Sequence, residues 1–475
     1  MTTRFCLLIT CWALASMSFS GDLLTHEIKP EQELLIIDVA VTDSKLADYP
    51  GVLSFGYLME QLGGESEDKT KLLLNFLTKW ESEQTVNTFK VPAREAIRDL
   101  VIEPWKKADG QEGVSDLEWI VNYKNAPFRL TALINRIDMA RIPELDPTRD
   151  ELISLGINPD SSAFTSGNAY YGPSISGEMR FTYCVCDQKT KEPLAGSFTT
   201  IFELANREYP MKAGEKKARR INDGNDGQRW AMRWHKLGEF DEIGAEYLTE
   251  LEKLVRDNIE TKGDLAPVLN QIRTNEGALA KTREMREFNL NSSRSAFEQV
   301  TMKQTPDLSY LGKHSPKNRA LANYINNNAE LIKLSRHKMN DTLEVRRNWE
   351  PFLAGSALFP DDPAEFFWDA RGVRDREARR AFSMNTCNGC HAKETATTNC
   401  LHIAPRKAGE PSQLSAFLGM SGERFLVRDP ARPAHRDEMS EIEKRIAIFQ
   451  AILSKDASSS KAMRKLKAER AGWAH

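Results

Sequence analysis

Apolar and polar positions alternate over several short segments in the first 300 residues, a pattern that predicts a β-sheet. Strand patterns occupy residues 34–41, 128–138, 179–185 and 196–203. The last two are separated by the turn-rich segment 187–193, which predicts a β-hairpin.

Apolar residues at helical spacing predict helices along the whole chain. They occupy residues 72–80, 93–105, 228–237, 247–259, 265–272, 320–334, 371–382 and 438–453. The last helix has one apolar stripe, formed by Ile442, Ile446, Phe449 and Leu453. Residues 300–345 are otherwise polar and rich in asparagine, so we expect a surface connection there.

The first twenty residues have the layout of a secretory signal peptide. Arg4 supplies a positive start, residues 5–19 are apolar, and small serines precede Gly21. The apolar stretch is shorter than the roughly 20 residues of a membrane span. We therefore expect export to the periplasm or the medium, with an uncleaved anchor or a lipoprotein attached through Cys11 as alternatives.

Composition narrows the classes of partner. The 475 residues are 40% hydrophobic and 28% charged, as is typical of globular proteins. The net charge of −3 predicts no electrostatic surface for nucleic acid or for an acidic membrane. The basic runs 216–220 and 461–470 are expected to be solvated helix faces.

The strongest chemical motif is Cys387-Asn388-Gly389-Cys390-His391, the Cys-x-x-Cys-His pattern of c-type haem attachment. The spacing lets both sulfurs reach the two vinyl groups of one porphyrin, and His391 then becomes the proximal axial ligand of the iron. Two alternatives stay open. One is a zinc site that uses Cys387, Cys390, Cys400 and either His391 or His402, and the other is a redox disulfide between Cys387 and Cys390.

The cysteine count agrees with a cofactor. Seven cysteines are present, and two of them lie in the predicted signal peptide, so five remain. An odd number cannot pair completely within one chain. If haem occupies two, Cys184, Cys186 and Cys400 are left, and we expect free thiols or one bridge to Cys400.

Residues 366–453 resemble a class I cytochrome c. Ala378 and Phe382 lie four positions apart just before the motif, a spacing that lets this helix pack closely against a crossing C-terminal helix. Pro405 stands near the place where these cytochromes have a proline whose backbone contacts the proximal histidine. The aromatic residue is one position farther from the first cysteine than is usual in the family.

The sixth iron ligand is not evident from the sequence. Met420 and His402 are the leading candidates, Met439 follows, and an open site is a further alternative. Methionine would raise the reduction potential and a second histidine would lower it.

A second resemblance covers more of the chain. Several strings are similar to a family of uncharacterised secreted bacterial proteins, namely residues 133–138, 177–181, 230–235, 269–276, 286–288 and 382–391. This family has no assigned reaction, so the resemblance implies no substrate.

Other polar groups favour structural roles. We interpret Asn135, Arg136 and Asp138 as a turn, with contact to a ligand as the alternative. We interpret Glu178, Arg180 and Glu203 as cross-strand ion pairs, with an acid/base pair as the alternative. Trp230, Trp234 and His235 are expected in an aromatic patch, and Arg273, Asn275 and Glu276 in a hydrogen-bonded network at a helix end. No hydrolase, nucleotide-binding or Rossmann motif is present.

The predicted fold is an α+β N-terminal region followed by a small, mainly α-helical cytochrome c-like domain. The expected segments are a signal peptide (1–20), an α/β region (21–110), an α+β domain (111–300), a helical connection (301–365), the haem domain (366–457) and a basic tail (458–475).

The expected function is one-electron transfer in the periplasm by a single covalent haem c, with a redox partner protein, no nucleic acid, and no membrane span once the signal is removed. A haem-dependent oxidoreductase with an open distal site and a non-enzymatic binding protein with a zinc site remain alternatives.

Overall fold

The structure is a computed structural model that describes residues 26–63, 69–140, 149–154, 176–206, 226–260, 269–335, 337–359, 365–397, 399–420 and 425–454. The predicted signal peptide and the two basic runs lie outside these ranges. Within them, every helix is too short or too polar to cross a bilayer.

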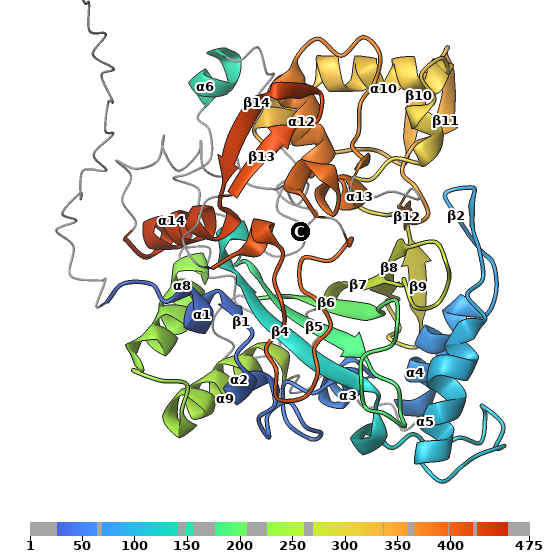
Figure 1. Cartoon of the computed structure of the whole chain (residues 1–475), viewed down its shortest axis with the longest axis vertical. Coiled ribbons are helices and arrows are strands. Elements are labelled where there is room, and N and C mark those ends of the chain that lie inside the picture. Colours follow the sequence, from blue (N-terminus) through green and yellow to red (C-terminus); the bar gives the residue numbers. More distant parts are fainter. Residues whose placement is uncertain are drawn as a thin grey trace, which may run out of the picture.

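An antiparallel sheet of eight strands forms the centre of the molecule (Figure 1). Its strand order is β1-β4-β5-β6-β7-β8-β12, and β9 pairs with β8 at one end. The strands are β1 (Leu35–Ile36), β4 (Phe128–Arg136), β5 (Glu178–Val185), β6 (Thr199–Ala205), β7 (Leu269–Asn275), β8 (Glu284–Leu290), β9 (Phe297–Val300) and β12 (Ala357–Leu358).

One face of the sheet is apolar. Phe181, Phe202, Ile272 and Phe288 are register partners across four neighbouring strands and therefore project from one face. They belong to the largest hydrophobic core, together with aromatic residues of the covering helices. These helices are α1 (Pro30–Glu33), α2 (Val39–Thr42), α3 (Phe55–Gly63), α4 (Lys69–Leu77), α5 (Glu103–Ala108), α8 (Asp226–His235) and α9 (Ala245–Ile259).

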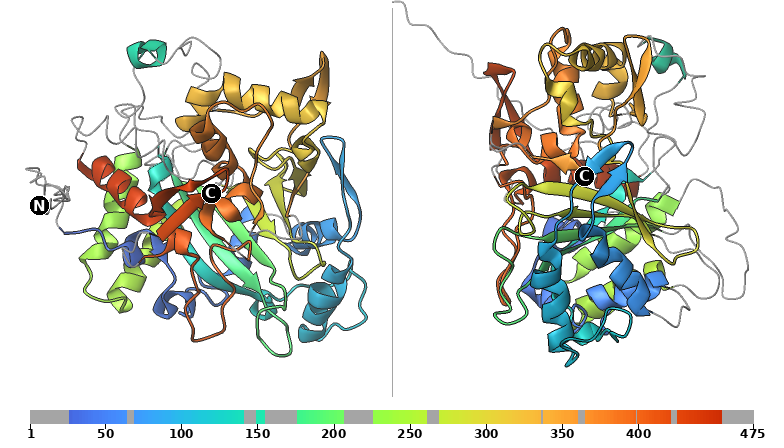
Figure 2. Two further views of the ribbon diagram at one scale, coloured as in Figure 1. Left: turned by 45° about the horizontal axis from the view of Figure 1, so that its top comes forward. Right: turned by 90° about the vertical axis from the view of Figure 1, so that its right-hand side faces the viewer.

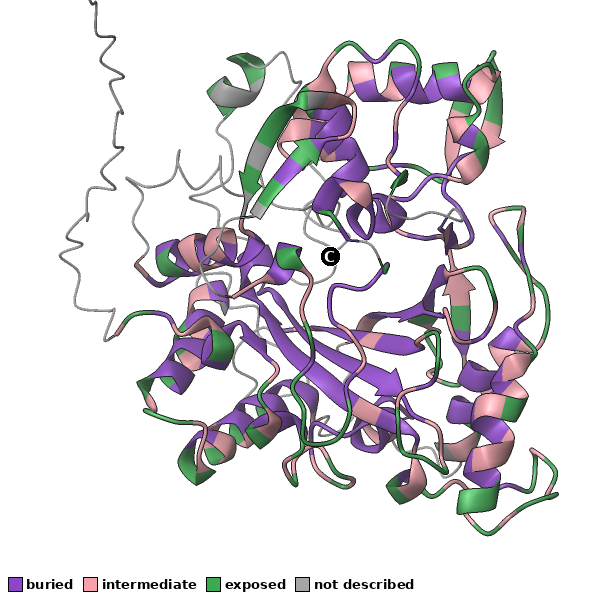
Figure 3. Cartoon of the chain, in the orientation of Figure 1, coloured by how far each residue is buried: buried purple, intermediate pink, exposed green. Residues whose placement is uncertain are grey.

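The opposite face of the sheet is polar and yet buried. Thr182, Ile201, Arg273 and Glu287 are register partners on this face, and all except the half-buried Ile201 are shielded from solvent. The C-terminal third of the chain covers them, so the sheet lies between two layers (Figures 2 and 3). This part contains α10 (Pro316–Asn327), α11 (Ala329–Lys333), α12 (Arg376–Met384), α13 (Cys387–Cys390) and α14 (Glu441–Ser454).

A second core joins two segments that the sequence separates. Tyr310, Leu321 and Phe352 from the predicted connection share one buried cluster with Trp368 and Phe382. Three two-stranded ribbons complete the described structure: β2 (Gln84–Val86) with β3 (Phe89–Val91), β10 (Thr342–Val345) with β11 (Asn348–Pro351), and β13 (Phe425–Asp429) with β14 (Arg432–Met439). The short α6 (Arg149–Ser154) is isolated between undescribed residues.

Most predicted elements are confirmed, including the β5–β6 hairpin and the helices α4, α8, α9, α10 and α12. The predicted helix 265–272 is wrong where the structure describes it, because residues from Leu269 onward form strand β7. The predicted strand 34–41 stops after Ile36, because the side chain of Asp38 accepts a hydrogen bond from the Ala40 backbone and caps α2.

The predicted packing of the last helix is also wrong. Helix α14 forms, but Ile448, Phe449 and Ile452 pack in the large core beside α8, whereas Ala378 and Phe382 of α12 belong to the second core. The β13–β14 ribbon, which the sequence did not predict, precedes α14 along the chain. The C-terminal region is therefore helical only in part. Among its described residues, Met384 at the end of α12 shares a cluster with Ile442 of α14, whereas the predicted contact of Ala378 and Phe382 with the α14 stripe is not formed.

Candidate haem-binding site

The Cys-x-x-Cys-His motif forms the short helix α13. The hydroxyl of Thr386 caps this helix by accepting a hydrogen bond from the Gly389 backbone N–H at 3.0 Å. Gly389 packs so tightly that a Cβ atom there would lie 2.2 Å from the carbonyl oxygen of Ser383. The middle of the motif thus requires glycine for steric reasons.

Two further hydrogen bonds hold the motif from outside. The backbone N–H of Cys387 donates to the Thr305 hydroxyl at 2.9 Å. The indole N–H of Trp368 donates to the side-chain oxygen of Asn388 at 2.8 Å. Both partners come from segments other than the motif, so tertiary structure orients α13.

The two thiols of the motif are fully buried in different apolar clusters. Cys387 packs with Met285, Met302 and Phe359, and Cys390 packs with residues that include Phe417. Burial raises the pKa of both thiols, so both are protonated at neutral pH.

His391 is oriented by a backbone carbonyl. Its Nδ1 donates to the carbonyl oxygen of Cys400 at 3.0 Å, and Asn275 of β7 donates to the same oxygen at 2.7 Å. Because Nδ1 carries the hydrogen, Nε2 carries the lone pair that binds a metal. Burial lowers the pKa of His391 to about 4, which keeps the ring neutral at physiological pH. The predicted contact with Pro405 is therefore replaced by one with Cys400.

A cavity lies between the polar face of the sheet and the C-terminal segment. Its volume is about 80 Å³, below the roughly 300–1,000 Å³ usual for cofactor sites, so the C-terminal segment and the sheet would have to move apart to admit a haem. The sheet contributes Ile134, Arg136, Arg180, Thr182, Thr199, Ile201, Asn275 and Met285, and the C-terminal part contributes His391, Leu401, His402, Ile403, Phe417, Leu418 and Arg445.

Three arginine side chains line the otherwise mostly apolar cavity. Each is held by an acidic neighbour: Arg136 by Asp138 at 3.0 Å, Arg180 by Glu178 at 2.8 Å, and Arg445 by Glu441 at 3.0 Å. These pairs fix the guanidinium groups in place before any ligand binds.

The ion pairs continue under the motif. Arg273 contacts Glu203 at 3.2 Å and Glu287 at 3.1 Å, and Arg180 lies 3.5 Å from Glu203. The predicted cross-strand ion pair is confirmed, and the predicted network around Arg273 exists on a strand instead of a helix end.

The candidate sixth ligands are placed differently. His402 lines the cavity, whereas Met420 packs beside the cluster that contains Cys390. Met439 ends β14 instead of opening the last helix, and its side chain lies outside the described residues. Met285 of β8 also lines the cavity. Sequence reasoning missed it because a methionine at an ordinary strand position gives no sign of a distant histidine.

The ring of His402 is close to that of His391. Their centroids are 4.2 Å apart, and His402 Nε2 faces Cys390 Sγ at 3.6 Å. Rings this close leave no room for a metal ion between them. His402 would have to move away from His391 to become a sixth ligand.

The zinc alternative needs three or four ligand atoms close together. Among the described residues, no three ligands from the Cys/His motif region have their donor atoms within 4.8 Å of one another. Tetrahedral zinc separates its ligand atoms by roughly 3–4 Å. Among the described residues, the motif region therefore has no preassembled set of zinc ligands.

The remaining predicted residues have structural contacts. Cys184, Cys186 and Cys400 are free thiols, and the Sγ atoms of Cys184 and Cys186 lie 4.0 Å apart. Asn135 forms a turn by accepting from the Ile137 backbone, while Trp230 and Trp234 are packed in the large core. His235, the third residue of the predicted aromatic patch, contacts Glu33 instead, at 2.8 Å.

Comparisons with protein-family models, curated protein sequences and solved structures give no significant match to this chain.

Proposed function

We propose that the protein is an exported mono-haem c-type cytochrome that transfers single electrons. The observation that supports this most is the placement of His391, whose lone-pair nitrogen belongs to a neutral ring in the wall of a cavity directly after the two cysteines of the motif. The covalent attachment points, Cys387 and Cys390, lie four and one positions before it in the same short segment.

The residues around the cavity fit a haem. The lining combines apolar side chains, which exclude water, with three arginines that can pair with the propionate carboxylates. Neither cysteine lines the cavity, so both sulfurs must turn toward it for attachment. When bound, a haem iron supplies a one-electron couple whose potential depends on the axial ligand and on burial.

The protein contributes orientation. The carbonyl of Cys400 holds the His391 ring, and Asn275 holds that carbonyl. A hydrogen bond of this kind makes a ligating imidazole more basic, which favours the oxidised iron. The three arginines add little net charge at the cavity, because Asp138, Glu178 and Glu441 each pair with one of them.

A haem-dependent oxidoreductase is the second candidate. Besides His391 and the arginines, the cavity lining includes two side chains that can bind iron, the thioether of Met285 and the imidazole of His402. Asn275 contributes an amide. Because His402 contacts His391, the cavity side of the iron would stay open unless Met285 or a moved histidine binds it.

Potentiometric titration with carbon monoxide binding separates these candidates. The full chain is expressed in a host that attaches haem in the periplasm. Electron transfer predicts a single one-electron wave and no rapid carbon monoxide binding, whereas an open site predicts rapid binding. The matched control is Cys184→Ala, which removes a buried thiol outside the motif. An absence of any redox wave in the visible spectrum would contradict both.

A further inference from the structure

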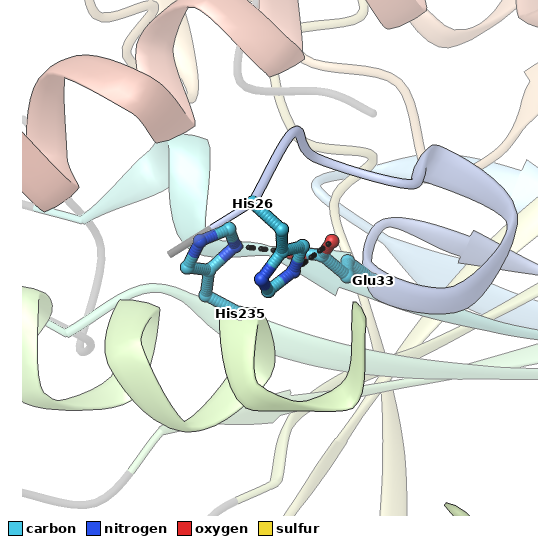
Figure 4. A group of neighbouring side chains, drawn as sticks. All are labelled: His26, Glu33 and His235. Carbon is cyan, nitrogen blue, oxygen red and sulfur yellow. Dashed lines mark hydrogen bonds and ion pairs between the residues drawn. The ribbon is translucent and has the colours of Figure 1, made fainter. Parts of the chain in front are cut away.

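A second cluster of metal-ligating side chains lies away from the haem motif. It consists of His26, Glu33 and His235 (Figure 4). His26 precedes α1, Glu33 ends α1, and His235 ends α8, so two segments about 200 positions apart in the chain meet here. One ligand atom from each residue lies within 4.8 Å of the other two.

The distances suit a shared cation. His26 Nε2 lies 3.4 Å from Glu33 Oε1, and His235 Nδ1 lies 2.8 Å from Glu33 Oε2. The two imidazole rings stack with centroids 3.9 Å apart and planes 12° apart. Bonds of about 2.0–2.1 Å to tetrahedral zinc separate ligand atoms by roughly 3.3 Å, close to the distances here. A metal ion lies in the plane of each imidazole that binds it, so the stacked rings would have to rotate out of their parallel arrangement to share the ion.

The charges also call for a cation. The carboxylate of Glu33 is fully buried and faces the two histidines and the backbone N–H of Lys29, while the Lys29 ammonium donates to the Phe240 carbonyl. A divalent cation among these three side chains would offset the charge of a carboxylate that is shielded from solvent.

Gly238 leaves room for the ligand atoms because it has no side chain. A Cβ atom on Gly238 would lie 2.1 Å from Glu33 Oε1 and 2.3 Å from His26 Nε2. Gly238 therefore lets the two ligand atoms approach each other. The side chain of His26 is 18% exposed, against 6% for His235, so an ion and a water ligand can enter from the His26 side.

We propose that His26, Glu33 and His235 bind one divalent cation of the zinc class. Two imidazoles and a carboxylate are ligands that zinc accepts readily, with a water completing the tetrahedron. The ion would fasten the segment before α1 to the end of α8. The ring of Phe449 of α14 lies 6.1 Å from the His235 ring, so the ion would also stabilise the packing of α14.

The test is zinc binding to the full, haem-loaded chain. The protein is stripped with a chelator and titrated with zinc chloride in competition with a chromophoric indicator. We expect one equivalent to bind with Kd below about 1 µM, and zinc to raise the melting temperature. His235→Ala and Glu33→Gln should weaken binding by about 100-fold or more. The matched control is His314→Ala, which removes an exposed histidine outside the cluster.

Gly238→Ala is a second variant that keeps all three ligands. It should weaken zinc binding sterically while the haem spectrum stays unchanged. His26→Ala, which removes the most exposed ligand, replaces His235→Ala if that variant does not fold. Zinc affinity unchanged in these variants, no stoichiometric binding by the wild type, or a site lost only in Cys390→Ala would each overturn the proposal. The haem result is independent of all three.

Discussion

At the scale of single residues, burial determines the chemistry of the histidines. His337 is the simplest case, because neither ring nitrogen has a hydrogen-bond partner among the described residues. Its ring lies beside Tyr324 and Phe382, with centroids 6.4 and 6.1 Å away. Burial lowers the pKa of His337 to about 3.

This depressed pKa predicts a loss of stability in mild acid. An unfolded histidine has a pKa near 6.5, so below that pH the unfolded chain binds a proton that the folded chain excludes. Between pH 6.5 and 5, His337 should cost about 2 kcal/mol of folding free energy. Denaturant unfolding at pH 7 and pH 5 checks this, with His337→Phe losing correspondingly less than the wild type. Equal losses in both proteins would refute it.

The sequence predicted some residue roles and could not predict others. The roles of Cys387, Cys390 and His391 are predicted from spacing alone and stay predictions, because haem attachment requires these residues to be close together in the chain. The carbonyl of Cys400 and the amide of Asn275 orient His391 from elsewhere. A backbone carbonyl has no sequence pattern, so Pro405 was predicted in its place.

At the scale of elements, buried ion pairs join the segments on either side of the motif helix α13. Arg379 of α12 is fully buried and contacts Glu394 and Asp429, the latter at 3.0 Å. Glu394 lies in the short helix Lys393–Thr395 just after the motif, and Asp429 ends β13. One guanidinium thus joins three elements around α13.

Removing this guanidinium should be costly. Arg379→Met removes the cation that the two buried carboxylates share and leaves Arg380 at 3.6 Å from Glu394 and Arg432 at 2.7 Å from Asp429. Loss of one partner of a buried ion pair typically costs about 3–5 kcal/mol, and we expect a value near the lower end. We expect a lower melting temperature and less haem incorporated per chain, measured by thermal unfolding and by absorbance. The control is Arg376→Met, because Arg376 contacts Asp369 at a half-exposed position on the same helix. A variant at 379 that is as stable as this control would contradict the prediction.

Element type was predictable where the periodicity was long, as in α9 and β4. The prediction of element type failed at β7, where the polar Gln271 is buried and the polar Asn270 is half-buried. The polar face of β7 is satisfied by ion pairs from β6 and β8. A pattern rule that equates burial with apolar residues cannot detect such a strand.

At the scale of the whole molecule, the sheet separates two environments. Its apolar face forms the large core, and its polar face lies under the Cys-x-x-Cys-His motif and the cavity. The α+β class was predictable from the sequence. The packing of the C-terminal part on the sheet was not, because it depends on contacts between β4–β8 and residues more than 100 positions away.

The central claim is that Cys387 and Cys390 attach a single haem beside this sheet. The most direct measurement is a pyridine haemochrome spectrum of the denatured, full-length protein after expression in a haem-attaching host. The account predicts a covalent c-type spectrum with one haem per chain, lost in Cys387→Ala and retained in Cys184→Ala. A colourless wild-type protein, or a haem extracted by acidic organic solvent, would contradict it.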